Sequence, residues 1–98
     1  MSIRLRSTRT QKKGADQVDA GATRIAAVQM ASGPHVAANL KEAARLIEMA
    51  VEQGARLVAL PEYFGIMGLK DTDKVAVREA YGSGPIQEFL ATTARKHG

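Results

Sequence analysis

The sequence predicts an α/β fold that begins with a parallel strand–helix–strand unit. Two short apolar runs, residues 24–30 and about 56–60, have the length and composition of buried strands. Between them, apolar residues recur at helical spacing from residue 37 to residue 52. Parallel strands need such a crossover connection, because a tight hairpin joins only antiparallel strands. The order strand, helix, strand therefore predicts two neighbouring parallel strands, each buried on both faces.

The expected helix is amphipathic, and the sequence marks both of its ends. Its apolar side is formed by Leu40, Ala43, Ala44, Ile47, Ala50 and Val51, with charged residues on the opposite side. The run Ser32, Gly33 and Pro34 predicts a turn between the first strand and this helix. Gly54 stands where a glycine in the left-handed conformation commonly follows the end of a helix.

The second strand closes at Pro61, which has no N–H group to donate to a sheet. Beyond it the sequence predicts a loop, a short helix over residues 72–80 capped by Asp71 or Thr72, and a final helix. Pro85 suits the first turn of this final helix, and Gly98 suits the position after its last residue. Two parallel strands with these helices bury too little sheet to be complete, so the predicted fold is interrupted.

Residues 1–22 have the composition of a disordered basic tail, and residues 23–98 form the expected folded part. The chain has 98 residues and a net charge of +4. Five basic and no acidic residues fall within residues 1–15, so the high isoelectric point comes from the tail. No aromatic residues are interleaved with these bases, so we expect no nucleic-acid binding. We expect a cytoplasmic protein; a mitochondrial transit peptide is the alternative interpretation of the basic tail.

The composition excludes several classes of site. Without cysteine, the chain has no disulfide, no thiolate metal site and no thiol nucleophile. Its two histidines, His35 and His97, are far apart and lack carboxylates at ligand spacing, so no metal site is expected. No apolar run approaches the roughly 18 residues that span a bilayer, so we expect no membrane insertion. The first strand-to-helix link lacks a glycine-rich phosphate-binding motif, which argues against a nucleotide cofactor.

Glu62 is the candidate catalytic residue. It directly follows Pro61, and in α/β sheets functional residues gather at the carboxyl ends of the strands. Tyr63 and Phe64 come next, and rings that shield a carboxyl group would raise its pKa and suit it to general-base catalysis near neutral pH. The alternative is that Glu62 is a solvated or arginine-paired carboxylate without a catalytic role. The local pattern alone favours this alternative over catalysis by about four to one.

Other polar residues near the strand ends have structural interpretations. Gln29 and Asn39 could orient groups near Glu62, but such side chains more often satisfy backbone groups, and we favour that role. His35 is interpreted as a solvated loop residue. The two aromatic residues after Glu62 are interpreted as packing residues, and the sequence assigns no substrate-binding residue.

Residues 24–98 resemble the N-terminal part of the nitrilase, or carbon–nitrogen hydrolase, superfamily. The matching features are a strand ending in Val28, Gln29 and Met30, then Asn39 at the start of a helix, Gly54 and Ala55 before the second strand, and the run from Leu57 to Phe64 that contains Pro61 and Glu62. A later Gly84 and Pro85 before an amphipathic helix also fit. The resemblance implies an αββα sandwich, of which this chain holds the N-terminal strand–helix–strand unit and the helices that follow.

The same resemblance implies a chemistry. Members hydrolyse small amides or nitriles through a Glu–Lys–Cys triad, need no cofactor and assemble as homo-oligomers. The triad Glu maps onto Glu62, whereas Lys70 and Lys74 are in the wrong context for the Lys and the sequence has no Cys. We therefore expect an amidase-like function in the complete enzyme and no activity of this chain alone. The alternative function is a non-catalytic binding or assembly module.

Overall fold

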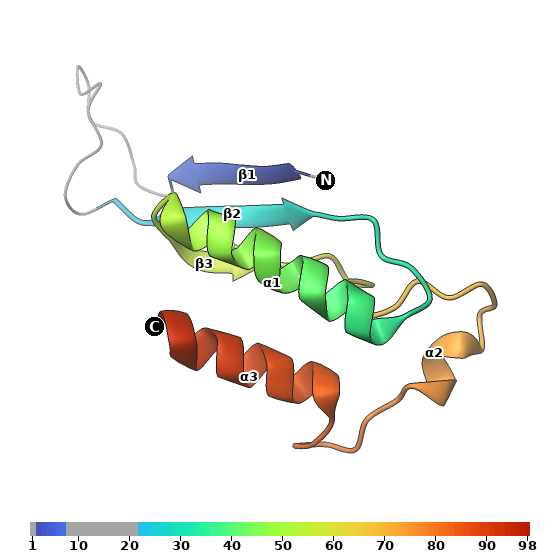
Figure 1. The fold of residues 1–98 in the computed structure, drawn as a ribbon. Helices are drawn as coiled ribbons and strands as arrows, with labels where there is room; N and C mark the ends of the chain where they lie inside the picture. The colour runs from blue at the N-terminus through green and yellow to red at the C-terminus, as the bar shows by residue number, and fades with distance from the viewer. Residues whose placement is uncertain (1, 8–21) are drawn as a thin grey trace.

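The computed structural model of the chain describes residues 2–7 and 22–98, which form one three-stranded sheet and three helices (Figure 1). In chain order the elements are β1 (Ser2–Ser7), β2 (Arg24–Gln29), α1 (Val36–Glu52), β3 (Ala55–Ala59), α2 (Asp73–Ala76) and α3 (Pro85–His97). The predicted strand, helix and strand correspond to β2, α1 and β3, which confirms the α/β class. Among the described residues, no helix is long and apolar enough to cross a bilayer.

The sheet has the strand order β1, β2, β3, with β2 in the centre. β2 and β3 run parallel, with Ala26 opposite Val58 and Ala27 opposite Ala59. Because α1 connects these two strands, they form the expected crossover unit. Their parallel direction places the carboxyl ends of both strands, and the loops that follow, at the same edge of the sheet.

The strand β1 corrects part of the prediction that residues 1–22 form a disordered tail. Ser2–Ser7 pairs antiparallel with β2, with Ile3 opposite Val28, and Ile3 packs against the buried residues of the sheet. The free edge of β2 offers unpaired backbone groups to an extended segment, and that pairing does not require a regular apolar face along the segment. Residues 8–21 lie outside the described part of the chain, so the prediction for them is untested.

The core lies between α1 and the sheet. Its buried apolar residues are Ala26 and Val28 of β2, Ala43, Leu46, Ile47 and Ala50 of α1, and Ala55 of β3. Small side chains dominate, and Leu46 is the largest side chain that is fully buried. The apolar side of α1 therefore centres on Leu46, while Leu40 at its margin is only half-buried. Gly54 has a φ of +91°, as expected for the glycine that follows the helix.

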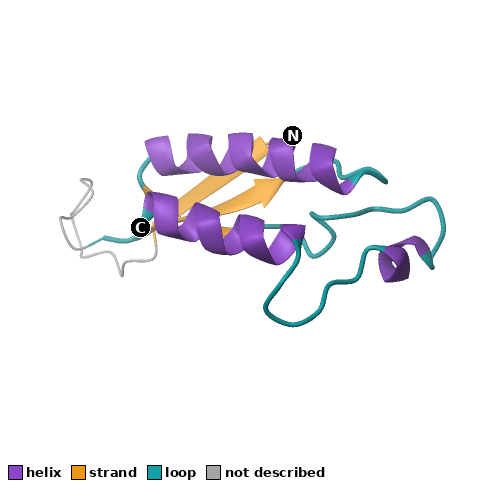
Figure 2. Ribbon diagram, turned by 60° about the horizontal axis from the view of Figure 1, so that its bottom comes forward, coloured by secondary structure: helices purple, strands orange, loops and turns teal. Residues whose placement is uncertain are grey.

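Only one face of the sheet is covered. Both α1 and α3 lie on the same side of it (Figure 2), and within residues 2–7 and 22–98 no element packs against the other side. Leu57 of β3 is therefore 61% exposed, whereas Val58 is half-buried against the core. The prediction that this strand is buried on both faces was wrong for this chain. An apolar strand is buried only where a second layer covers it, and composition does not supply that layer.

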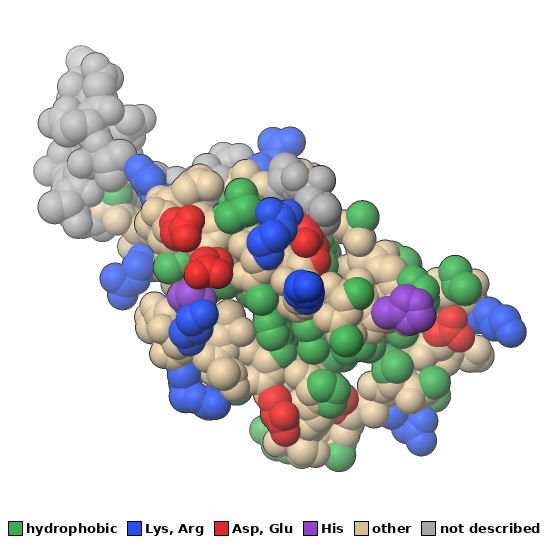
Figure 3. All heavy atoms as spheres, in the orientation of Figure 1, with side chains coloured by type: hydrophobic (Ala, Val, Ile, Leu, Met, Phe, Trp, Pro, Cys, Tyr) green, Lys and Arg blue, Asp and Glu red, His purple; other side chains and the backbone are tan. Residues whose placement is uncertain are grey.

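The helix α3 lies beside α1 and is held less tightly. An apolar hollow of about 260 Å³ remains between α1, β3 and α3. Figure 3 shows hydrophobic side chains gathered between α1 and α3 on this side of the molecule. No residue of α3 is buried, although Ile86 and Phe89 are half-buried on its inner side. The contact of α3 with the rest of the chain is therefore partial.

The helix α2 is shorter than the helix expected over residues 72–80, because it ends at Ala76. Its first residue, Asp73, accepts hydrogen bonds through Oδ2 from the backbone N–H groups of Leu69 at 2.9 Å and Lys70 at 3.0 Å. Asp73 thus fixes the loop before the helix. No residue of α2 is buried, so no packing stabilises further helical turns toward residue 80.

A carboxylate from the loop before α3 caps that helix. Gly84 precedes α3 and has no side chain, so Glu79 takes the capping role. Its Oε2 accepts from the Ile86 N–H at 2.6 Å, and its Oε1 accepts from the Gln87 N–H at 3.0 Å. The Gln87 Nε2 group also donates to Oε1 at 3.1 Å. A negative charge at this end of a helix is favourable, because the unpaired N–H groups point toward it.

Leu46→Ala should destabilise the chain strongly. Leu46 is 2% exposed at the centre of the core, so truncation removes buried methyl groups and leaves a cavity. We expect the free energy of unfolding to fall by about 2–5 kcal/mol, measured by urea denaturation and circular dichroism. Leu57→Ala on the uncovered face is the control and should cost much less. Equal losses in the two variants would contradict the placement of the core.

Acid should weaken the capping of α3 by Glu79. Desolvation is the strongest single influence on this group and raises its pKa, but the hydrogen bonds from Gln87 and Ile86 together outweigh it and lower the pKa below 4.5. A lowered pKa in the folded state means that ionised Glu79 stabilises the chain above pH 4.5, and that this stabilisation is lost as the pH falls through the folded-state pKa.

The melting temperature of the unmodified chain should fall between about pH 6 and about pH 3. In Glu79→Gln this fall should therefore be smaller. The same substitution at Glu48, which is exposed on α1, is the control and should leave this change intact. A pH dependence that is the same with and without the Glu79 carboxylate would contradict the capping role.

Candidate active site

Glu62 lies in a tight turn at the carboxyl edge of the sheet. β3 ends at Ala59, and the Phe64 N–H donates to the Pro61 carbonyl oxygen at 3.1 Å, which closes a four-residue turn. Glu62 and Tyr63 are the two central residues of this turn. The structure therefore places Glu62 just beyond the end of the strand, where the sequence placed it.

The Glu62 carboxylate is open to solvent. Glu62 is exposed, and among the described residues no hydrogen bond or ion pair engages its side chain. Tyr63 beside it is 44% exposed. The expectation that aromatic rings shield this carboxyl group was therefore wrong for this chain, because the rings pack against other elements. An exposed carboxylate without a fixed partner can accept a proton from a group that is brought to it.

The two aromatic residues of the turn face different parts of the chain. The Phe64 ring lies near Phe89 of α3, with the ring centroids 6.4 Å apart and the planes at 37°. The Tyr63 ring instead lies beneath Lys74 of α2, whose Nζ is 5.7 Å from the ring centroid. The rings therefore connect the turn with both of the helices that follow it.

Asn39 joins the two loops at this edge of the sheet. It lies in the first turn of α1 and is 5% exposed. Its Oδ1 accepts from the Gly33 N–H at 2.8 Å, and its Nδ2 donates to the carbonyl oxygens of Gly33 at 2.8 Å and Gly65 at 2.9 Å. These bonds correspond to the backbone-satisfying role that we favoured for Asn39. Gly33 follows β2 and Gly65 follows β3, so the two loops are held together.

Two further hydrogen bonds connect the same loops. The Ser32 hydroxyl donates to the Phe64 carbonyl oxygen at 2.9 Å, and the Met67 N–H donates to the Gly33 carbonyl oxygen at 2.9 Å. The sequence interpretation of Ser32 as a turn residue missed this contact. The available signal was the position of Ser32, a small polar residue in the loop after β2. The loops that follow two parallel neighbouring strands meet at one edge of the sheet.

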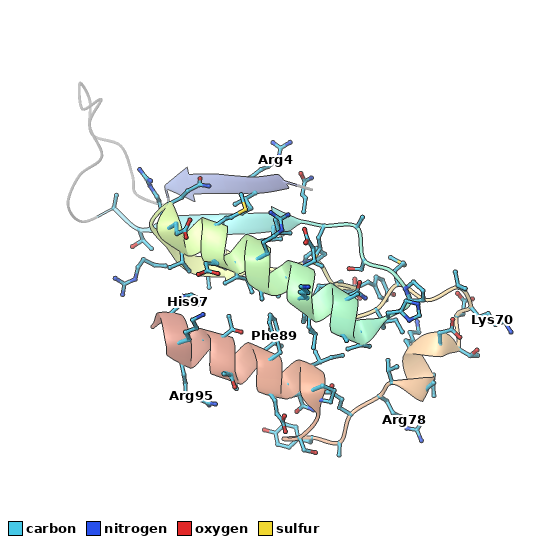
Figure 4. All side chains as sticks on the ribbon, viewed as in Figure 1. Arg4, Lys70, Arg78, Phe89, Arg95 and His97 are labelled. Carbon is cyan, nitrogen blue, oxygen red and sulfur yellow. The ribbon has the colours of Figure 1, made fainter. Side chains whose placement is uncertain are left out.

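The remaining candidates lie around this edge without completing a catalytic set. Gln29 is exposed at the last position of β2. His35 is exposed at the position before α1, and its side chain makes no capping hydrogen bond to the helix. Lys70 points away from the rest of the molecule (Figure 4). A hollow of about 220 Å³ opens beside the turn, lined by residues 63, 66–68, 70, 71 and 74. Residues 2–7 and 22–98 contain no cluster of three or more His, Asp or Glu side chains that could hold a metal ion.

Comparison with known proteins identifies the family to which these features belong. A profile of the carbon–nitrogen hydrolases matches residues 24–98. Deaminated glutathione amidases from two strains of Synechocystis sp. are each 44% identical to this chain over 71 residues, which is 72% of the chain and 25% of each amidase. No solved structure gives a significant match. The chain therefore belongs to the carbon–nitrogen hydrolase family.

Proposed function

We propose that this chain supplies the general base of an amide-hydrolysing enzyme, and that Glu62 is this base. The observation that carries the proposal is the position of Glu62, a free carboxylate in a tight turn at the carboxyl edge of parallel strands. The family match over residues 24–98 and the similarity to two amidases support the reaction class. A carboxylate with no fixed cation beside it is available to accept a proton, as a general base must.

In the proposed reaction, a cysteine thiol from the rest of the enzyme attacks the carbonyl carbon of the amide. Glu62 accepts the thiol proton as the S–C bond forms, and donates it to nitrogen as the C–N bond breaks and ammonia or an amine leaves. Water then attacks the thioester. Glu62 takes a proton from this water and returns it to the sulfur as the carboxylic acid leaves. A lysine stabilises the negative charge on the carbonyl oxygen in both steps.

The partners of Glu62 in this reaction come from outside the chain. The sequence contains no cysteine, and the chain spans only 25% of the length of each amidase that it matches. Lys74 does not take the role of the lysine in our proposal, because it lies over the Tyr63 ring. As substrate we propose a small amide, because the relatives are named as amidases that act on deaminated glutathione.

A non-catalytic assembly module is the second candidate. The uncovered face of the sheet and the 61% exposure of Leu57 favour it, because an apolar sheet face is stable when another layer covers it. The two candidates differ in what they require of Glu62. Catalysis needs its carboxylate, whereas assembly through the sheet face does not involve that residue. Experiments on Glu62 therefore separate them.

The 98-residue chain on its own should hydrolyse no amide. Its sequence offers no thiol, so the thioester intermediate of the proposed reaction cannot form. Purified chain would be incubated with deaminated glutathione and with a simple aliphatic amide, and released ammonia and amine would be measured. We expect values equal to the buffer blank. Release above the blank that disappears in Glu62→Gln would contradict the need for an external nucleophile.

Glu62→Gln should nearly abolish turnover in a complete enzyme. The test uses a chimera in which residues 24–98 replace the matching N-terminal segment of a Synechocystis amidase. Glutamine keeps the size of the side chain and loses its basicity, so kcat should fall by at least about 10²-fold while the circular dichroism spectrum is unchanged. Glu48→Gln makes the same chemical change on the exposed side of α1 and should keep normal kcat. Near-normal turnover of Glu62→Gln would favour the assembly module.

A further inference from the structure

Asn39 is the one buried polar side chain in the described part of the chain, at 5% exposed. It is the fourth residue of α1, and its backbone N–H already donates to the His35 carbonyl oxygen. The side chain is therefore not needed to cap the helix. Asparagine is also a weak helix former at such positions, because its amide competes for backbone groups. Its burial here requires an explanation other than helix formation.

The hydrogen bonds of the Asn39 amide provide that explanation. Its oxygen accepts from the Gly33 N–H, and its nitrogen donates to the Gly33 and Gly65 carbonyl oxygens, all at 2.8–2.9 Å. Both N–H groups and the oxygen are used, so the amide has one favourable orientation. Gly33 and Gly65 belong to the loops after β2 and β3. One side chain therefore sets the distance between the two strand exits.

The loop after β3 also lies against α3. A Cβ atom added at Gly65 would lie 3.0 Å from Ile86 Cδ1, so Ile86 lies close to the backbone there. The Gly65 backbone is thus bonded to the Asn39 amide and lies against α3. One residue earlier, the Phe64 carbonyl oxygen accepts from the Ser32 hydroxyl. The last residue of the turn and the residue that follows it are therefore both hydrogen-bonded to the other loop or to α1.

We propose that Asn39 is a positioning residue for Glu62, acting through the backbone of Gly65. This inference rests on the proposed role of Glu62 as the general base. Among residues 2–7 and 22–98, no hydrogen bond engages the Glu62 side chain, so its place is set by the backbone on both sides of it. On one side that backbone is β3, and on the other it is Phe64 and Gly65. A general base must lie within hydrogen-bond reach of its proton, and a displacement of about 1 Å can cost roughly 10²-fold in rate.

Hydrogen exchange on the full 98-residue chain tests whether Asn39 holds the loop. The reporters are the backbone N–H groups of Gly33, Phe64 and Met67, which are hydrogen-bonded at this edge. Asn39→Ala should speed their exchange by about tenfold or more relative to amides in the middle of α1, because the Gly33 N–H loses its acceptor and the loop that carries Phe64 and Met67 loses its bond at Gly65. Leu46→Ala is the control and should speed both sets of amides alike. Equal acceleration in Asn39→Ala, or reporters that are unprotected in the unmodified chain, would overturn the proposal.

Asn39→Asp provides a nearly isosteric second variant with a pH readout. A carboxylate at this position can accept from the Gly33 N–H but cannot donate to the Gly33 and Gly65 carbonyl oxygens. Exchange at Phe64 and Met67 should therefore be fast at neutral pH, while the Gly33 N–H keeps its acceptor. Protonation of the introduced carboxyl group restores one donor. At each pH, the exchange rate of these amides in Asn39→Asp is divided by their rate in the unmodified chain. This ratio should therefore return toward one in acid. A ratio that stays constant or rises in acid would count against the proposal.

The chimeric enzyme connects this loop with catalysis. Asn39→Ala and Asn39→Asp should lower its kcat by about tenfold or more with little change in KM, because the base moves while substrate contacts remain. Leu46→Ala, assayed below its melting temperature, should keep normal kcat. If Glu62→Gln leaves kcat unchanged, the proposed function fails and the positioning role fails with it. If Glu62→Gln lowers kcat but both Asn39 variants keep it, the positioning role alone is wrong.

Discussion

The parallel pairing of β2 and β3 is the constraint on which the rest of the structure depends. Parallel neighbours cannot be joined by a hairpin, so α1 has to cross the sheet, and its apolar side becomes the core. The same pairing brings both strand exits to one edge, where the first turn of α1 also begins. Asn39 can reach both loops for this reason. The core and the candidate site are therefore results of one pairing.

Much of this arrangement was predictable because its causes act within a few residues. Pro61 cannot continue a sheet, Gly54 adopts a positive φ after α1, and Pro85 begins α3. The placement of Glu62 was accessible in the same way, since a carboxylate after a strand-ending proline is visible in the sequence. Asn39 was also identified, although only the structure shows that its partners come from two loops.

What the sequence did not predict depends on partners that are distant along the chain. β1 pairs with β2 although its composition resembles that of a solvated tail. An open strand edge forms backbone hydrogen bonds, which do not depend on the side chains of the added strand. The Ser32 hydroxyl meets a carbonyl group 32 residues away. Apolar content indicates that β3 can be buried, but it does not indicate which face is covered, and this is why the exposure of Leu57 was not foreseen.

The free edge of β3 affects how readily one copy of the chain associates with another in solution. β3 has one strand neighbour in the described sheet, so backbone N–H and C=O groups along its outer side are available to another strand. Leu57 adds an exposed apolar side chain to this strand, while Arg56 adds a charge that opposes the approach of an identical copy. The charge of Arg56, which salt screens, therefore opposes edge-to-edge association at this strand.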